Sequence, residues 1–60
     1  MTPRETRERV LRALERGPLY IGALPLIVNA APAQVEAAVR ELKRQGRVSR
    51  DIHGTVTRAA

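Results

Sequence analysis

Residues 17–35 form a stretch of nineteen residues without a charged side chain, although the segments on both sides are rich in arginine. By its number of residues such a stretch is long enough to cross a bilayer, which requires about 20 apolar residues. Pro18, Pro25 and Pro32 interrupt it, and helix-breaking residues in lipid leave backbone groups without hydrogen-bond partners. We therefore expect no membrane span. We expect the prolines to divide the stretch into a turn, a short helix and the start of another helix.

The length of the chain limits it to one domain, residues 1–60. A domain of 60 residues buries only about 60% of the surface that its unfolded chain exposes, so its stability is marginal. The chain contains no cysteine and a single histidine, so we expect neither a disulfide nor a metal site, and no cofactor. Its N-terminal residues alternate in charge and lack the apolar region of a secretory signal, so we expect a cytoplasmic location.

The first helix is predicted at about residues 3–16. Thr2 and Glu5 have the spacing of a capping box, and Pro3 lies at the first helical position. Gly17 and Pro18 provide the stop signal. One face is apolar and carries Val10, Leu11 and Leu14. The other faces alternate arginine and glutamate, which we interpret as a solvated surface with ion pairs between residues four apart.

Two more helices follow. The second is predicted at about residues 22–29, with Pro25 in its first turn, because proline deeper in a helix removes a backbone hydrogen bond. Asn29 tolerates the left-handed conformation that a tight turn requires. The third helix is predicted at about residues 32–45, from Pro32 to a basic last turn before Gly46. Its apolar face consists of Val35, Ala38, Val39 and Leu42.

A small hairpin is predicted at about residues 47–58. Val48, Ile52 and Val56 are β-branched, and Gly54 is expected to take a positive φ in the turn. Two strands are not stable alone, so the hairpin must pack against the helices. The predicted fold class is therefore mostly α with a small C-terminal β-hairpin.

The segment GPLYIGALPLIVNAAPAQVEAAVRELKRQGRVSR, residues 17–50, resembles the winged helix-turn-helix DNA-binding superfamily. A short apolar helix, a tight turn, a helix that begins at proline and the pattern Leu42, Gly46, Val48 carry the resemblance. It implies a three-helix domain in which residues 32–45 form the recognition helix and residues 47–58 form the wing. The chain departs from the family pattern at Asn29, where glycine is usual, and at Leu26 and Ile27, where polar or basic residues are usual.

Duplex DNA is the partner that the resemblance implies and that the net charge of +5 favours. With its apolar face inward, the third helix directs two alanines and two arginines outward. Arg40 matches the acceptors of guanine, Gln34 matches adenine, and Lys43 and Arg44 are suited to phosphates, while hairpin arginines suit a minor groove. The expected DNA-binding residues are Ala33, Gln34, Ala37, Arg40, Lys43, Arg44, Arg47, Arg50 and Arg58. The alternative is a solvated face on which Glu36 pairs with Arg40.

The expected function is transcriptional regulation, most simply repression by occlusion of a promoter or operator. The protein would then associate with the nucleoid when it is bound to DNA. No nucleophile with an adjacent base and no glycine-rich phosphate loop is present, so we expect no enzyme and no small-molecule ligand. The near absence of aromatic residues argues against binding to single-stranded RNA.

A protein-interaction module is the alternative function. If Leu24 and Val28 face the core, other apolar residues nearby must point elsewhere, and contiguous exposed apolar side chains usually mark an interface. The candidate interface residues are Leu19, Tyr20, Leu26 and Ile27. A homodimer is the simplest partner for such a surface.

Overall fold

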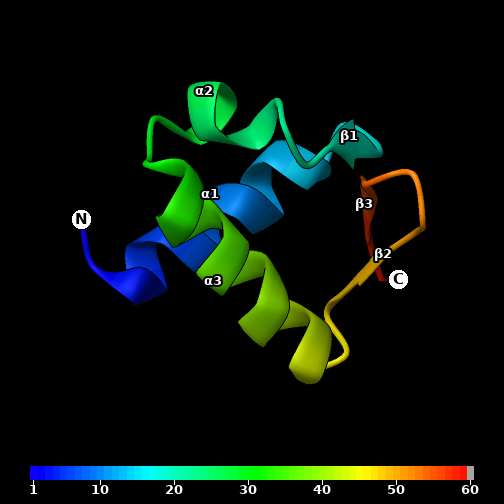
Figure 1. The fold of residues 1–60 in the computed structure, drawn as a ribbon. Coiled ribbons are helices and arrows are strands. Elements are labelled where there is room, and N and C mark those ends of the chain that lie inside the picture. Colours follow the sequence, from blue (N-terminus) through cyan, green and yellow to red (C-terminus); the bar gives the residue numbers. More distant parts are fainter. Residues whose placement is uncertain (60) are drawn as a thin grey trace.

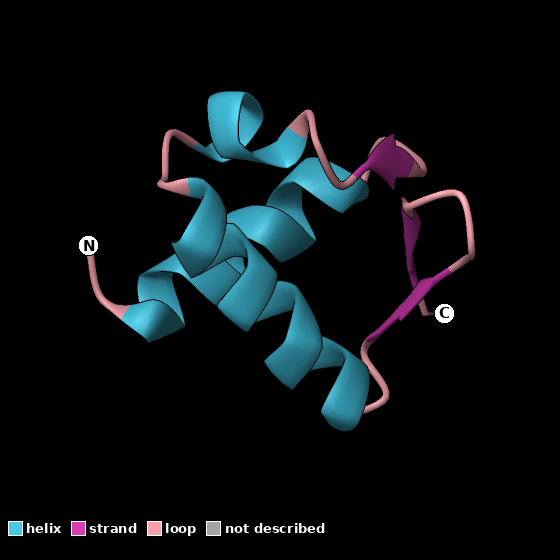
Figure 2. Cartoon of the chain, in the orientation of Figure 1, coloured by secondary structure: helices cyan, strands magenta, loops and turns pink. Residues whose placement is uncertain are grey.

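Three helices and a small antiparallel sheet make up the protein (Figures 1 and 2). The structure is a computed structural model that describes residues 1–59. The elements in chain order are α1 (Pro3–Leu14), β1 (Leu19–Tyr20), α2 (Leu24–Val28), α3 (Pro32–Arg44), β2 (Val48–Arg50) and β3 (Thr55–Arg58). In Figure 1, α3 crosses in front of α1, α2 lies above both, and the sheet stands at the right. The predicted class, mostly α with a small C-terminal hairpin, is confirmed.

The helix α1 begins with the predicted cap. The hydroxyl oxygen of Thr2 accepts a hydrogen bond from the backbone N–H of Glu5 at 3.1 Å, and Pro3 takes the first helical position. The helix ends at Leu14, earlier than the predicted bound near residue 16. Gly17, with φ at 133°, donates its N–H to the carbonyl of Leu14 at 3.0 Å, and this closed turn stops the helical ladder.

The strand β1 was not predicted; its residues, Leu19 and Tyr20, belong to the uncharged stretch before the second helix. Both are extended and pair with the hairpin, Leu19 opposite Val56 and Tyr20 opposite Thr55. The sheet therefore has three strands in the order β1-β3-β2, and β3 is central.

The helix α2 has only five residues, Leu24–Val28, and starts later than the predicted residue 22. The preceding residues form tight turns instead, with the N–H of Ala23 bonded to the carbonyl of Tyr20 at 3.0 Å. Pro25 lies in the first turn, and Asn29 adopts the left-handed conformation at φ 57° and ψ 54°, both as predicted. The turn to α3 therefore needs no glycine.

The core lies where α1, α2 and α3 meet and extends to the sheet. Leu24 and Leu42 are completely buried, and Val28 is 4% exposed. Thr6 is the unpredicted member at 1% exposure, and its hydroxyl donates to the backbone carbonyl of Thr2 at 3.1 Å, which satisfies the buried polar atom. The buried apolar residues are Val10, Leu11, Leu14, Ile21, Leu24, Val28, Val35, Ala38, Val39, Leu42, Val48 and Val56.

The hairpin of β2 and β3 turns through Ile52, His53 and Gly54. Gly54 has the predicted positive φ, at 86°, and the Asp51 carboxylate accepts the N–H groups of His53 and Thr55 at 2.9 Å each. Ile52 was expected to belong to the apolar pattern of the strands. That expectation was wrong: its side chain is 96% exposed, because the three-residue turn directs it away from the helices.

Candidate nucleic-acid interface

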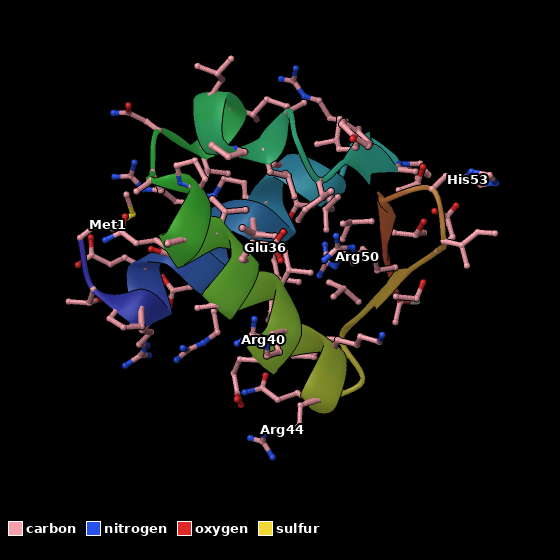
Figure 3. All side chains as sticks on the ribbon, viewed as in Figure 1. Met1, Glu36, Arg40, Arg44, Arg50 and His53 are labelled. Atoms are coloured by element: carbon pink, nitrogen blue, oxygen red, sulfur yellow. The ribbon has the colours of Figure 1, made fainter. Side chains whose placement is uncertain are left out.

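The exposed face of α3 is the feature on which the candidate site depends. Val35, Ala38, Val39 and Leu42 hold the opposite face in the core at 0–3% exposure. The helical repeat therefore directs Ala33, Ala37, Arg40 and Arg44 to the surface, and all four are exposed. Figure 3 shows Arg40 and Arg44 along the C-terminal half of α3.

The N-terminal turn of α3 contributes one polar side chain to the candidate site, that of Gln34. The N-cap is Ala31, whose side chain cannot accept a hydrogen bond. Gln34 compensates in part, because its Oε1 atom accepts the backbone N–H of Ala31 at 3.2 Å. This bond leaves the Nε2 atom of Gln34 as the group that can donate to a partner at the helix start.

Arg44 is held by a neighbouring carboxylate on its own helix. Its Nε donates to Glu41 Oε1 at 3.0 Å, its Nη2 donates to Glu41 Oε2, and Gln45 Nε2 donates to the same Oε2 at 2.9 Å. The hydrogen bonds from Arg44, and secondarily from Gln45, lower the pKa of the Glu41 carboxyl from 4.5 to about 2, and burial opposes them. Two nitrogens of the Arg44 guanidinium group thus donate to Glu41, and the third nitrogen can still donate to another group.

The hydrogen bonds of Glu41 with Arg44 and Gln45 predict how the stability of the protein depends on pH. The folded pKa of Glu41 lies below its unfolded value, so its contribution to stability is complete above pH 4.5 and disappears as the pH falls towards 2. A carboxyl NMR titration should place the midpoint of Glu41 at about 2. Arg44→Ala should move the midpoint upward and reduce the loss of stability in that window. A wild-type midpoint at 4.5 would show that the cluster does not persist in solution.

Glu36 and Arg50 connect α3 to the hairpin. Arg50 Nη1 donates to Glu36 Oε2 at 3.2 Å across fourteen residues of sequence, and in Figure 3 the two side chains point toward one another. The alternative pairing of Glu36 with Arg40 is not formed. Both partners are partly solvated, so the pair contributes at most about 1 kcal/mol of stability. The main effect of the pair is to hold the Arg50 guanidinium group beside α3.

Three of the expected DNA-binding cations are not engaged by the protein within residues 1–59. Arg40, Lys43 and Arg47 are exposed, and their side chains form neither an ion pair nor a hydrogen bond within residues 1–59. They lie on the second half of α3 and on the segment that leads into β2. A cation without a protein partner is free to neutralise a phosphate or to donate to a base edge.

Arg58 does not join this group. Its Nη1 donates to Glu15 Oε1 at 3.4 Å, so it reaches from β3 to the turn after α1 rather than towards α3. His53 stands at the tip of the hairpin and points away from the helices in Figure 3. The structure thus places eight of the nine expected DNA-binding residues on α3 and the adjacent part of the hairpin, and separates Arg58 from them.

The four residues predicted to form a protein–protein interface are exposed to different degrees. Leu24 and Val28 face the core as predicted, and this leaves Leu26 at 89% exposure and Ile27 at 50%. Tyr20 is 59% exposed, and Leu19 is half-buried against the core. A group that sequence reasoning missed lies next to them: Arg9 and Arg12 of α1 and Arg16 of the following turn line a groove with Leu19 and Ile27. The recurrence of arginine after three and four residues was the available signal.

Comparison of the chain with protein-family models, with curated proteins and with solved structures finds no match.

Two further observations concern metal ligands and membrane spans within residues 1–59. They contain no group of three or more His, Asp or Glu side chains that could hold a metal ion. The longest helix, α3, has 13 residues, and no helix is both long and apolar enough to cross a membrane.

Proposed function

We propose that the protein is a sequence-specific double-stranded DNA-binding protein of the winged helix-turn-helix class. In this proposal α3 is the recognition helix and the β2–β3 hairpin is the wing. The observation that carries the proposal is the exposed face of α3, where the unpaired Arg40 follows the small side chains of Ala33 and Ala37. The three helices and the antiparallel sheet are compatible with this class.

The proposed complex places α3 in the major groove, which is wide enough for a helix. Ala33 and Ala37 allow the helix backbone to approach the bases, and their methyl groups can contact thymine. Arg40 donates to a guanine, and Gln34 donates through its free Nε2 atom. Lys43, Arg44 and Arg47 contact phosphates, and Glu36 holds Arg50 in position for the neighbouring groove.

The biological role that fits this activity is transcriptional regulation by occlusion. A small domain that covers a promoter or operator excludes other proteins from the site without a separate effector domain. We accordingly place the protein in the cytoplasm, on the nucleoid when it is bound to DNA. No small-molecule ligand and no enzymatic activity form part of the proposal.

Arg40→Ala is expected to weaken binding to a selected operator sequence by about 1–3 kcal/mol, because the bidentate contact to guanine is lost. Fluorescence anisotropy against the selected duplex and against mixed-sequence duplexes, over a range of salt, measures the effect. Wild-type affinity should fall steeply as salt rises, since phosphate contacts release counterions. Sedimentation of the same complex gives the number of chains per duplex.

Arg4→Ala is the matched control, since it removes the same charge from an exposed position at the start of α1. It should leave discrimination between duplexes unchanged. Equal weakening on every duplex by Arg40→Ala would assign Arg40 to phosphate contact only. Absence of wild-type binding at low salt would refute the proposed function.

A second candidate function is favoured by the exposed apolar side chains of Tyr20, Leu26 and Ile27. In this case the protein is an interaction module that associates through β1 and α2, most simply as a homodimer. Such a dimer is also compatible with DNA binding, because a two-fold assembly matches a palindromic operator. The sedimentation measurement without DNA separates the monomer from the dimer.

A further inference from the structure

A groove of about 650 Å³ lies between α1 and α2. Ala13, Leu19 and Ile27 contribute apolar surface to it, and three arginines line it as well: Arg9 and Arg12 of α1, and Arg16 of the turn after α1. None of these residues belongs to α3 or to the hairpin, so the groove is separate from the proposed DNA interface.

The three arginines lie on one face of the α1 segment and the turn that follows it. Arg9 and Arg12 are three residues apart in α1 and therefore lie on one side of the helix, and Arg16 in the following turn lines the same groove. Arg9 Nη1 donates to the carbonyl oxygen of Val28 at 3.2 Å, which anchors this side chain at the end of α2. Arg12 and Arg16 are exposed and have no carboxylate partner within residues 1–59.

The carboxylates of the chain itself are committed elsewhere. Four of them already hold ion pairs with arginines, namely Glu8, Glu15, Glu36 and Glu41. Glu5 accepts the hydroxyl of Thr2 at 3.3 Å, and Asp51 accepts two N–H groups in the hairpin turn. Within residues 1–59, a second copy of this chain therefore offers the groove only carboxylates that already hold partners in their own chain. Duplex DNA offers phosphates but no apolar side chain for the groove to bury.

We propose that this groove binds an acidic amphipathic helix of another protein. An apolar face of that helix packs on Ala13, Leu19 and Ile27, and carboxylates one helical turn apart pair with Arg12 and Arg16. The apolar contact provides affinity, and the carboxylates determine orientation and exclude basic or neutral segments. This site does not depend on the proposed DNA-binding function.

A labelled synthetic peptide tests the proposal. The probe is a fluorescein-labelled helix of about three heptads with leucine along one face and glutamate beside it, and the control peptide carries glutamine for every glutamate. We expect saturable binding of the acidic peptide in fluorescence anisotropy at low salt. The double variant Arg12→Ala/Arg16→Ala should raise the Kd about tenfold, and the glutamine peptide should bind about tenfold more weakly to the wild type.

Two matched controls locate the binding. Arg40→Ala/Lys43→Ala removes the same charge from α3 and should leave the Kd of the peptide within about twofold. Ile27→Ser should raise the Kd several-fold, whereas Leu26→Ser, which changes an 89% exposed neighbour outside the groove, should not. Circular dichroism of each variant confirms that it is folded before its Kd is compared.

Three results would overturn the proposal. The first is absence of peptide binding to the wild type at low salt. The second is equal weakening by the two double variants, which would indicate general charge attraction. The third is a dimer that Arg12→Ala/Arg16→Ala dissociates, which would make a second copy the occupant. DNA titrations of the same variants keep the two proposals apart, because either binding activity can fail while the other remains.

Discussion

Leu24→Ala is expected to unfold a large fraction of the protein at 25 °C. Leu24 is completely buried where α2 meets the other helices, and truncation of a buried leucine costs about 2–5 kcal/mol. A chain of 60 residues has a total free energy of unfolding of about 3–9 kcal/mol. The expected loss is therefore comparable with the total stability of the protein. Urea unfolding followed by circular dichroism at 222 nm measures the change.

Leu26→Ala is the matched control for this prediction. Leu26 lies two residues further along the same short helix, and its side chain is 89% exposed. Its truncation should change the free energy of unfolding by no more than about 0.5 kcal/mol. Similar losses in the two variants would mean that α2 does not pack on the core through Leu24.

Gly54→Ala is expected to cost about 2–5 kcal/mol of stability, from two causes that act together. A side chain in the left-handed region costs about 1–2 kcal/mol, and Gly54 has φ at 86°. A Cβ atom at this position would also lie 3.0 Å from Tyr20 Cε1 and 3.1 Å from Ile21 Cγ2, and overpacking of this kind costs about 1–3 kcal/mol. The midpoint of thermal unfolding is the measurement.

Gly46→Ala separates the two causes. Gly46 also has a positive φ, at 75°, but a Cβ atom there would meet nothing within 4 Å. Its cost should therefore be the backbone part alone, about 1–2 kcal/mol. If both variants lose the same stability, the contact of the hairpin turn with Tyr20 and Ile21 is loose enough to accommodate a methyl group.

The helices could be predicted from the sequence because their limits are local. Pro3 and Pro32 mark the first turns of α1 and α3, and Asn29 tolerates the left-handed turn that α2 requires. Each of these signals acts within one helical turn of the residue that carries it. The exposed face of α3 followed from the same local periodicity.

The strand β1 and the ion pairs between elements could not be predicted in the same way. Leu19 is extended because it pairs with Val56, 37 residues later, and no pattern near Leu19 identifies that partner. Glu36 had a plausible partner four residues away in Arg40, but the fold brings Arg50 within 3.2 Å of it. The groove between α1 and α2 likewise depends on an approach of two helices that periodicity alone does not describe.

The central position of β3 in the sheet has a consequence for synthesis of the protein. The strand that joins β1 to β2 comes after all the other elements in the chain. While residues 55–58 are still inside the ribosome, β1 has no strand to pair with, and the core lacks Val56. The helices therefore emerge with apolar faces that the sheet cannot yet cover. Folding to the native state therefore follows translation of β3, and until then these apolar faces are the surface through which a nascent chain can aggregate.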